Sequence, residues 1–200
     1  MHKAIIVGGI GAGKSTTCRM FGELGIPVFY SDKIAKRIMD SDKEVISKIK
    51  KEFGESIYAD GVLDRKALAE IVFNNAERLL RLNEIVHPAV ADAFEKFIQI
   101  NEVFKDSDYV TEEAAIGIET GIYKKFDFVV LVTADEDVRI NRTMTRDNCS
   151  EEKVRDRMRN QMSDEEKKQY ADFVIVNNDF PNLECQVKAV HKKILESINK

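Results

Sequence analysis

The sequence feature that most constrains the fold is a glycine-rich stretch near the start of the chain, Gly8-Gly9-Ile10-Gly11-Ala12-Gly13-Lys14-Ser15, followed by Thr16. It comes directly after residues 4–7 (AIIV), a continuous apolar segment typical of a buried strand. A helical pattern follows it and ends at Gly25. A strand, a glycine turn and a helix in this order predict an α/β architecture with the turn at the carboxyl end of a strand.

The same stretch fits G-x-x-x-x-G-K-[ST] at every fixed position and is therefore identified as a phosphate-binding P-loop. Glycines let the backbone approach a phosphate chain, and successive N–H groups then form an anion nest at the start of a helix. Lys14 would bridge the β- and γ-phosphates, and the Ser15 hydroxyl would ligate Mg²⁺. We expect the nucleotide to contact Gly8, Gly9, Gly11, Ala12, Gly13, Lys14, Ser15 and Thr16.

Composition narrows the class of protein. The chain has 200 residues, which is enough for one α/β domain with an inserted piece. Its net charge is −4, so it has no overall positive field that would recruit nucleic acid. Met1-His2-Lys3 leads directly into a short strand, and no apolar stretch reaches membrane-spanning length, so we expect neither a signal peptide nor a membrane partner. The three cysteines lie far apart, which fits a reduced, cytoplasmic location.

Five short apolar segments have the character of strands: residues 4–7, 26–30, 109–116, 128–132 and 173–176. Helical patterns separate them, so we predict a three-layer α/β fold with a parallel five-stranded sheet and ligands at the carboxyl ends of the strands. Residues 40–104 carry helical patterns and no obvious strand, and Pro88 is expected to begin a new helix there. That stretch is too long for one crossover and indicates an inserted helical subdomain.

Two arginine-bearing helices follow the fourth strand. Arg139, Arg142 and Arg146 are spaced to share one face of the first helix. Ser150-Glu151-Glu152-Lys153 resembles a capping box and would open the second. A hairpin of two such helices suits a lid that neutralises charge on a transferred phosphoryl group. The alternative is a solvated face with Glu/Arg pairs, but the cluster beside a P-loop favours the lid. The predicted parts are a core (1–39, 106–140, 165–200), a helical subdomain (40–105) and a lid (141–164).

Asp32 comes directly after the second strand, at the sheet edge where Lys14 and the metal are expected. It could accept the proton of an attacking hydroxyl, as the catalytic aspartate of kinases does. It could equally be the N-cap of the helix that follows, and the two roles can coexist. His87, directly before Pro88, is more typical of a capping or packing residue than of a catalyst.

Two absences restrict the kind of P-loop protein. No Asn-Lys-x-Asp follows the fifth strand, where the chain reads Asn177-Asn178-Asp179, and this argues against guanine specificity. No apolar strand ends in a clear Walker-B aspartate, which motors and AAA-type ATPases need. Both absences favour a kinase of small molecules.

Together these motifs resemble the dephospho-CoA kinase family over nearly the whole chain. Residues 8–16 look like its GGIGSGKS(T) loop, residues 31–36 are similar to its D-A-D-x-I-A-R segment, and residues 82–88 match its L-N-x-x-x-H-P. Further along, residues 142–147 resemble its R-x-x-x-R-D, residues 157–161 its R-I-x-x-Q, and residues 171–178 its A-D-x-V-I-x-N-N. Many families share the P-loop, whereas the ordered set is much more specific.

The resemblance implies ATP-dependent phosphorylation of the ribose 3′-hydroxyl of dephospho-CoA by a nucleotide-binding core, a helical substrate domain and a lid. It implies Asp32 as the base, Lys14 and Ser15 as phosphate and metal anchors, Arg142 and Arg146 as lid donors, and Asn177 near the adenine. The acceptor is expected at Asp32, Arg65, His87 and Glu119. We expect a monomer or a weak homo-oligomer.

The sequence departs from the family pattern at two places. Tyr30 stands where the family has the first aspartate of D-A-D, and residues 115–119 keep Glu119 but not the proline and leucines of P-L-L-x-E. The second change would alter the wall of the substrate site. Two alternatives stay open: a nucleoside monophosphate kinase, which would use the same core and lid, and a nucleotide-binding regulator without catalysis. Tyr30 supports the regulator, whereas the retained Lys14 and lid arginines oppose it.

Overall fold

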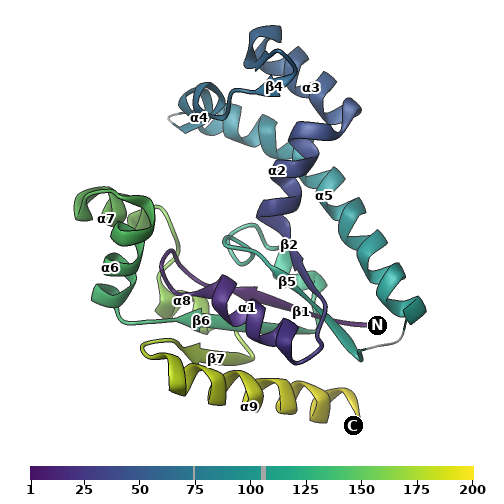
Figure 1. Ribbon diagram of the computed structural model, residues 1–200, viewed down its shortest axis with the longest axis vertical. Helices are drawn as coiled ribbons and strands as arrows, with labels where there is room; N and C mark the ends of the chain where they lie inside the picture. The colour runs from purple at the N-terminus through teal and green to yellow at the C-terminus, as the bar shows by residue number, and fades with distance from the viewer. Residues whose placement is uncertain (74, 105–106) are drawn as a thin grey trace. The chain divides into compact units, whose positions relative to one another are not determined.

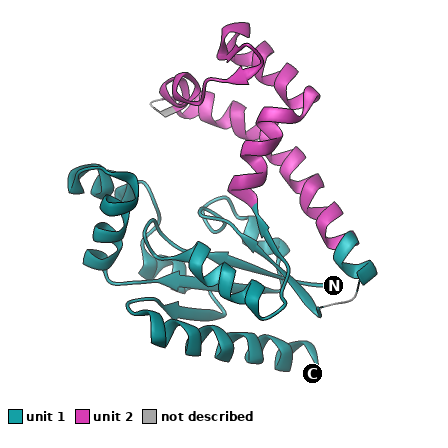
Figure 2. Ribbon diagram, viewed as in Figure 1, with its two compact units in different colours: residues 1–30, 100–200 teal, residues 31–99 magenta. Residues whose placement is uncertain are grey.

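The computed structural model describes residues 1–73, 75–104 and 107–200. Within them the chain forms two compact units, residues 1–30 with 100–200 and residues 31–99 (Figure 2). Residues 31–39, which the sequence assigned to the core, group with the second unit because their helix packs against other elements of that unit. Residues 141–164 belong to the first unit, and their separate role as a lid stays a prediction.

The first unit is built on a five-stranded sheet in which every pairing is parallel (Figure 1). β1 (His2–Val7) is central, between β5 (Tyr109–Glu113) and β6 (Phe128–Thr133), and β2 (Val28–Tyr30) and β7 (Phe173–Val176) form the edges. Residues 4–7 of β1 are fully buried, as expected for a strand covered on both faces. The predicted five-stranded parallel sheet is confirmed, although its third strand in the chain is shorter than predicted and ends at Glu113.

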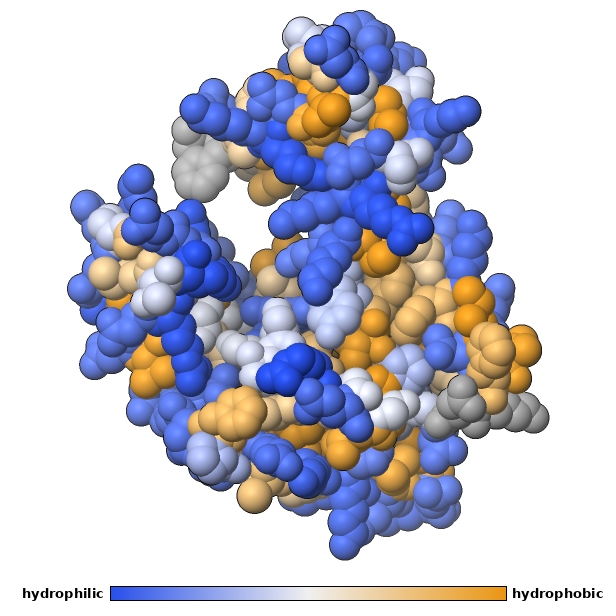
Figure 3. Space-filling model, viewed as in Figure 1, coloured by the Kyte–Doolittle hydropathy of each residue, from blue (hydrophilic) through white to orange (hydrophobic). Residues whose placement is uncertain are grey.

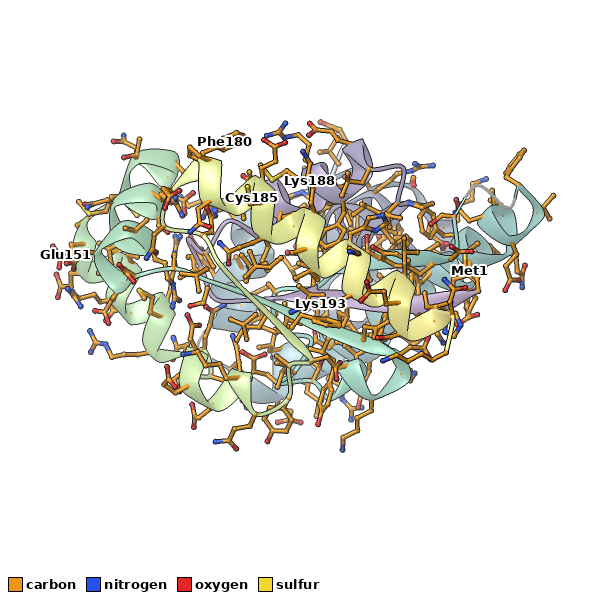
Figure 4. The ribbon with its side chains drawn as sticks, turned by 90° about the horizontal axis from the view of Figure 1, so that it is seen from below. Met1, Glu151, Phe180, Cys185, Lys188 and Lys193 are labelled. Carbon is orange, nitrogen blue, oxygen red and sulfur yellow. The ribbon has the colours of Figure 1, made fainter. Side chains whose placement is uncertain are left out.

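Helices α1 (Lys14–Glu23) and α9 (Phe180–Ile198) cover one face of this sheet. Their apolar residues pack with alternate residues of the strands, among them Ile6, Val130 and Ile175. Figure 4 views this layer face on and shows α9 lying across the strands, with Cys185, Lys188 and Lys193 along its length. These three residues are exposed, so α9 is an amphipathic helix that presents one side to the sheet.

The other face of the sheet has a thinner cover. The connection after β5, with the 3₁₀ helix η2 (Ile122–Lys125), and residues around the short helix α8 (Asp164–Lys168) pack there on Ile5, Val7 and Leu131. Helices α6 (Glu136–Asp147) and α7 (Glu151–Arg159) pack against each other and form the predicted hairpin. The sheet therefore lies between two layers, which confirms the three-layer prediction.

The second unit has its own apolar core. It contains α2 (Ser31–Ser41), α3 (Lys43–Phe53), η1 (Glu55–Ile57), β3 (Tyr58–Ala59), β4 (Val62–Leu63), α4 (Arg65–Phe73) and most of α5 (Ala76–Phe104). Its central residues include Ile49, Tyr58 and Val86. The prediction that no strand interrupts these helices is wrong, because β3 and β4 form a hairpin. Two residues per strand are too few to give an alternating pattern, and the dipeptide Asp60-Gly61, which is typical of a turn, is the local signal that the hairpin carries.

Two predictions about how helices begin are also wrong. Pro88 does not begin a helix but lies inside α5, which continues through it; Val86 before it and Phe94 after it are both buried, and this burial offsets the missing backbone hydrogen bond. Ser150 is the N-cap of α7 as expected, but its side chain forms no capping hydrogen bond. The reciprocal bond of a capping box is also missing, because the third helical residue is Lys153, which has no acceptor. A capping box does form at α8, between Ser163 and Glu166. Across the described residues, no helix is both long and apolar enough to span a membrane.

Candidate active site

The P-loop connects β1 to α1 at the carboxyl end of the central strand. Gly13, directly before α1, has φ +92°, a left-handed conformation that favours glycine. A Cβ atom at this position would lie 1.9 Å from Nδ2 of Asn177. The loop therefore has the backbone freedom that the motif predicts, and it is packed tightly against its surroundings.

The two functional side chains of the motif both lie at the loop. Nζ of Lys14 donates hydrogen bonds to the carbonyl oxygens of Gly8 at 2.9 Å and Gly9 at 3.2 Å, which holds the ammonium group over the loop. The Ser15 hydroxyl donates to Oε1 of Glu113 at 2.7 Å. A cation, a hydroxyl and a carboxylate thus gather where the phosphate chain is expected.

Glu113 is the last residue of β5, the strand that pairs with β1. Its carboxylate lies beside Ser15 at the carboxyl end of that strand, and the sequence did not single it out as a site residue because no aspartate ends the strand. Ser15 and Glu113 together offer oxygen ligands of the kind that Mg²⁺ prefers.

Asn177 is buried at the end of β7 and holds the loop from the other side. Its side-chain Nδ2 donates to the carbonyl oxygen of Ala12 at 2.8 Å, and its backbone oxygen accepts from Nη1 of Arg142 at 2.7 Å. Arg142 therefore connects α6 to the segment that supports the P-loop. The sequence did not predict this supporting role for Asn177.

The predicted lid donors differ in their surroundings. Arg146 is exposed and forms two hydrogen bonds with the carboxylate of Asp147, to which Arg157 of α7 also donates at 2.8 Å. These guanidinium groups, Arg146 first, lower the pKa of Asp147 to about 2. Glu136 of α6 also pairs with Arg155 of α7. The hairpin is thus joined by ion pairs, and the face of it that Figure 3 shows has hydrophilic residues around a smaller apolar area.

The residues expected to hold the acceptor are divided between the units. Asp32, Arg65 and His87 lie in the second unit, whereas Glu119 lies in the first. Asp32 is exposed in the first turn of α2, which begins at Ser31, so Asp32 is inside the helix and does not form the N-cap. Glu119 forms an ion pair of 2.9 Å with Nζ of the fully buried Lys167.

Two of these side chains have surroundings that the sequence did not indicate. Arg65 donates to Oδ2 of Asp40 at 2.7 Å and to the backbone oxygen of Lys36, so α4 is held to α2. His87 lies within continuous α5 rather than before a new helix, which removes the capping role considered from the sequence. Partial burial of its ring lowers the pKa of His87.

Comparison with known proteins agrees with this geometry. A family model described as dephospho-CoA kinase matches residues 4–182. The dephospho-CoA kinase of Chlorobaculum tepidum is 38% identical over 200 residues, covering 95% of this chain and 93% of that protein. The dephospho-CoA kinase of Bacillus cereus is 39% identical over 193 residues, with 94% of each chain covered.

Solved structures show the same likeness. The Thermus thermophilus protein TT1252 superposes with a TM-score of 0.86 at 32% identity, covering 96% of this chain and 97% of that one. Dephospho-CoA kinase from Campylobacter jejuni has a TM-score of 0.70 at 28% identity, with 98% of each chain covered. A shikimate kinase from Acinetobacter baumannii, at 19% identity and a TM-score of 0.53, shares the fold alone. The family model matches most of this chain, and the two relatives align with nearly all of it. The chain therefore belongs to the dephospho-CoA kinase family.

Proposed function

We propose that this protein transfers the γ-phosphoryl group of ATP to the ribose 3′-hydroxyl of dephospho-CoA, giving coenzyme A. The observation that carries the proposal is the arrangement of Lys14, Ser15 and Glu113 at one sheet edge, in a chain whose family match extends over residues 4–182. A P-loop with a hydroxyl–carboxylate pair is suited to nucleotide phosphates, and the family supplies the acceptor.

On the nucleotide side, the backbone N–H groups of the loop and Lys14 would bind the phosphate chain. Mg²⁺ would be held by Ser15, with Glu113 beside it; their oxygen atoms, 2.7 Å apart, fit a hard cation. When bound, Mg²⁺ neutralises charge on the phosphates. In its presence the Ser15 hydroxyl would turn from the carboxylate to the cation.

On the acceptor side, Asp32 would remove the proton of the 3′-hydroxyl. Its exposed position in the first turn of α2 supports this role, since among the described residues it accepts no hydrogen bond that would occupy it. Arg65, His87 and Glu119 would contact the acceptor. Lys167 would orient the Glu119 carboxylate, with which it forms a buried ion pair.

The arginines of α6 would act on the phosphoryl group as charge develops. Arg142 already lies beside the P-loop support at Asn177, whereas Arg146 would have to exchange Asp147 for a phosphate. Both contacts of Arg146 are charge-assisted, and an exchange of one anionic partner for another requires little net loss of hydrogen bonds.

Tyr30 does not prevent this assignment. It ends β2 and pairs in register with Glu113 of β5. Burial, the neighbouring Cys18 and Glu113 raise the pKa of Tyr30, so the phenol stays neutral and adds no charge to the site. We infer that Glu113 supplies at this edge the second carboxylate that the family places at position 30.

Replacement of Asp32 by asparagine tests the proposal. Asparagine keeps the shape of the side chain but cannot take a proton, so the rate of ADP release with ATP, Mg²⁺ and dephospho-CoA should fall at least about a hundredfold. The melting temperature and ATP affinity should not change. Asp42→Asn is the matched control: Asp42 caps α3 in the same unit, and asparagine caps about as well, so both activity and stability should persist.

Other acceptors distinguish the alternatives. A nucleoside monophosphate kinase would release ADP with a nucleoside monophosphate and not with dephospho-CoA, and a regulator would bind ATP without releasing ADP in either mixture. Turnover of Asp32→Asn within a few fold of the wild type would assign the base elsewhere, with Glu113 and Glu119 as the next residues to replace.

A further inference from the structure

Both backbone groups of Ile10, at the tip of the P-loop, are held by side chains from outside the loop. Its N–H donates to Oε1 of Gln161 at 2.9 Å, and its carbonyl oxygen accepts from Nε of Arg139 at 3.0 Å. Arg139 belongs to α6, and Gln161 follows α7. Besides the turn hydrogen bond from Ala12 N–H to the carbonyl oxygen of Gly9, the tip is thus held by one side chain from α6 and one from the segment after α7.

Arg139 itself is held in one orientation. Its side chain is only 10% exposed, and its Nη1 lies 3.0 Å from Oδ2 of Asp164, the first residue of α8. The Asp164 carboxylate also accepts a hydrogen bond from the hydroxyl of Thr133, at the end of β6. A guanidinium group is planar, so fixing one edge on Asp164 also fixes the direction in which Nε donates.

The guanidinium group lies directly against the loop. A Cβ atom built on Gly9 would come within 2.1 Å of Nη2 of Arg139. The loop and the arginine are therefore in close contact, and neither can move far without the other. The sequence pattern places Arg139 with Arg142 and Arg146 on one helix face. Of these three arginines, Arg139 alone is buried in the structure.

A phosphate-binding loop recognises its ligand through backbone N–H groups, so the affinity depends on how these groups are oriented before the ligand arrives. We propose that Arg139, with Gln161, is a positioning residue that holds the P-loop in its phosphate-binding conformation through the backbone of Ile10. The proposal rests on the nucleotide site assigned above.

A purely structural role of the Arg139–Asp164 ion pair has to be distinguished from the positioning of the loop. A buried ion pair contributes little net stability when both partners can be replaced together, whereas removal of one partner leaves an unpaired buried charge. Single substitutions of Arg139 or Asp164 would therefore confuse destabilisation with loss of positioning. The test needs variants in which the charge is removed from both partners.

Two double variants meet this need. Arg139→Gln with Asp164→Asn keeps a nitrogen donor near the position of Nε, whereas Arg139→Met with Asp164→Asn has a side chain of similar length without a donor. The asparagine side chain at position 164 retains an acceptor for Thr133 in both. The two proteins have no charge at either position and differ mainly in the hydrogen bond to Ile10.

We expect the methionine variant to bind ATP about 2- to 12-fold more weakly than the glutamine variant, the range for one net hydrogen bond. Both variants should bind adenosine, which has no phosphates, with equal affinity in calorimetry, and both should be folded at the temperature of the measurement. Arg155→Gln is a surface control on the same hairpin. It should leave the ATP affinity at the wild-type value, because Arg155 is exposed and forms its ion pairs with Glu136 and Glu151.

Equal ATP affinities of the two double variants would overturn the proposal, as would an equal loss of affinity for ATP and adenosine. If the methionine variant does not fold, Gln161→Met compared with the wild type applies the same test to the N–H of Ile10, since both side chains are neutral and only glutamine has the acceptor. Lys14→Ala separates the two proposals. An unchanged ATP affinity in that variant would refute the nucleotide site itself. A large loss of ATP affinity in Lys14→Ala, together with equal ATP affinities of the two double variants, would refute only the positioning role.

Discussion

Replacement of Gly13 by alanine should destabilise the first unit more than the same change at Gly25, although both glycines have positive φ. Gly13 has φ +92° and Gly25 has φ +84°. Left-handed backbone costs a residue with a Cβ atom roughly 1–2 kcal/mol, and this term is common to both substitutions. Apart from Gly25 itself and its two chain neighbours, no atom of the described residues lies within 4 Å of the place that a Cβ atom on Gly25 would occupy, so Gly25→Ala should cost only this strain.

At Gly13 a second term is added. The new Cβ atom would lie 1.9 Å from Nδ2 of Asn177, a buried side chain that donates to the carbonyl oxygen of Ala12. Moving Asn177 away breaks this bond inside the protein, at a cost of about 1–3 kcal/mol for the unsatisfied groups. Gly13→Ala should therefore lower the free energy of unfolding by about 2–5 kcal/mol, against about 1–2 kcal/mol for Gly25→Ala.

Urea denaturation of the two variants measures the difference, and both sites lie in the same compact unit, so the same transition reports on them. Asn177→Ala provides the decisive background, because it removes the colliding atom. In that background Gly13→Ala should cost no more than Gly25→Ala does. Equal destabilisation by the two single substitutions, or an undiminished cost in the Asn177→Ala background, would refute the reasoning.

Three further results are expected. Lys14→Ala should remove nearly all phosphoryl transfer without lowering the melting temperature, because this side chain acts on phosphate charge rather than in the core; near-wild-type turnover would contradict the P-loop assignment. Arg142→Ala should lower kcat more than it raises the KM for ATP, and an effect on KM alone would make Arg142 a docking residue. Tyr109→Phe should cost about 1 kcal/mol, since the buried hydroxyl forms a 2.8 Å hydrogen bond with Nδ1 of His191. Burial raises the pKa of Tyr109, so wild-type stability should fall as the pH rises above about 10, and the phenylalanine variant should lack this contribution in alkaline unfolding curves.

Features that depend on neighbouring residues could be read from the sequence. The spacing of glycines before Lys14 and Ser15 predicts the loop, and the apolar segments on either side predict the strand and helix that it connects. Asp42 and Asp64 precede helical patterns, and both accept hydrogen bonds from the backbone of the helix that follows. These interactions span two to three residues, so a local pattern is enough to specify them.

Where long-range packing competes with a local signal, the local signal misleads. Pro88 is a good first residue for a helix, yet α5 continues through it because apolar residues on both sides are buried. Ser150 looks like a cap from its neighbours, but capping depends on which side chain reaches the free N–H group, and Ser163 is the residue that forms the box.

By itself, the sequence determined the phosphate-binding loop, the parallel sheet and the family, because each depends on short ordered motifs along the chain. Only the tertiary structure decided what supports the loop. Glu113, Arg139 and Asn177 are separated from their P-loop partners by 98, 129 and 165 residues. At such distances in the chain no spacing rule connects the two partners, and only the folding of the strands into one sheet brings their ends together.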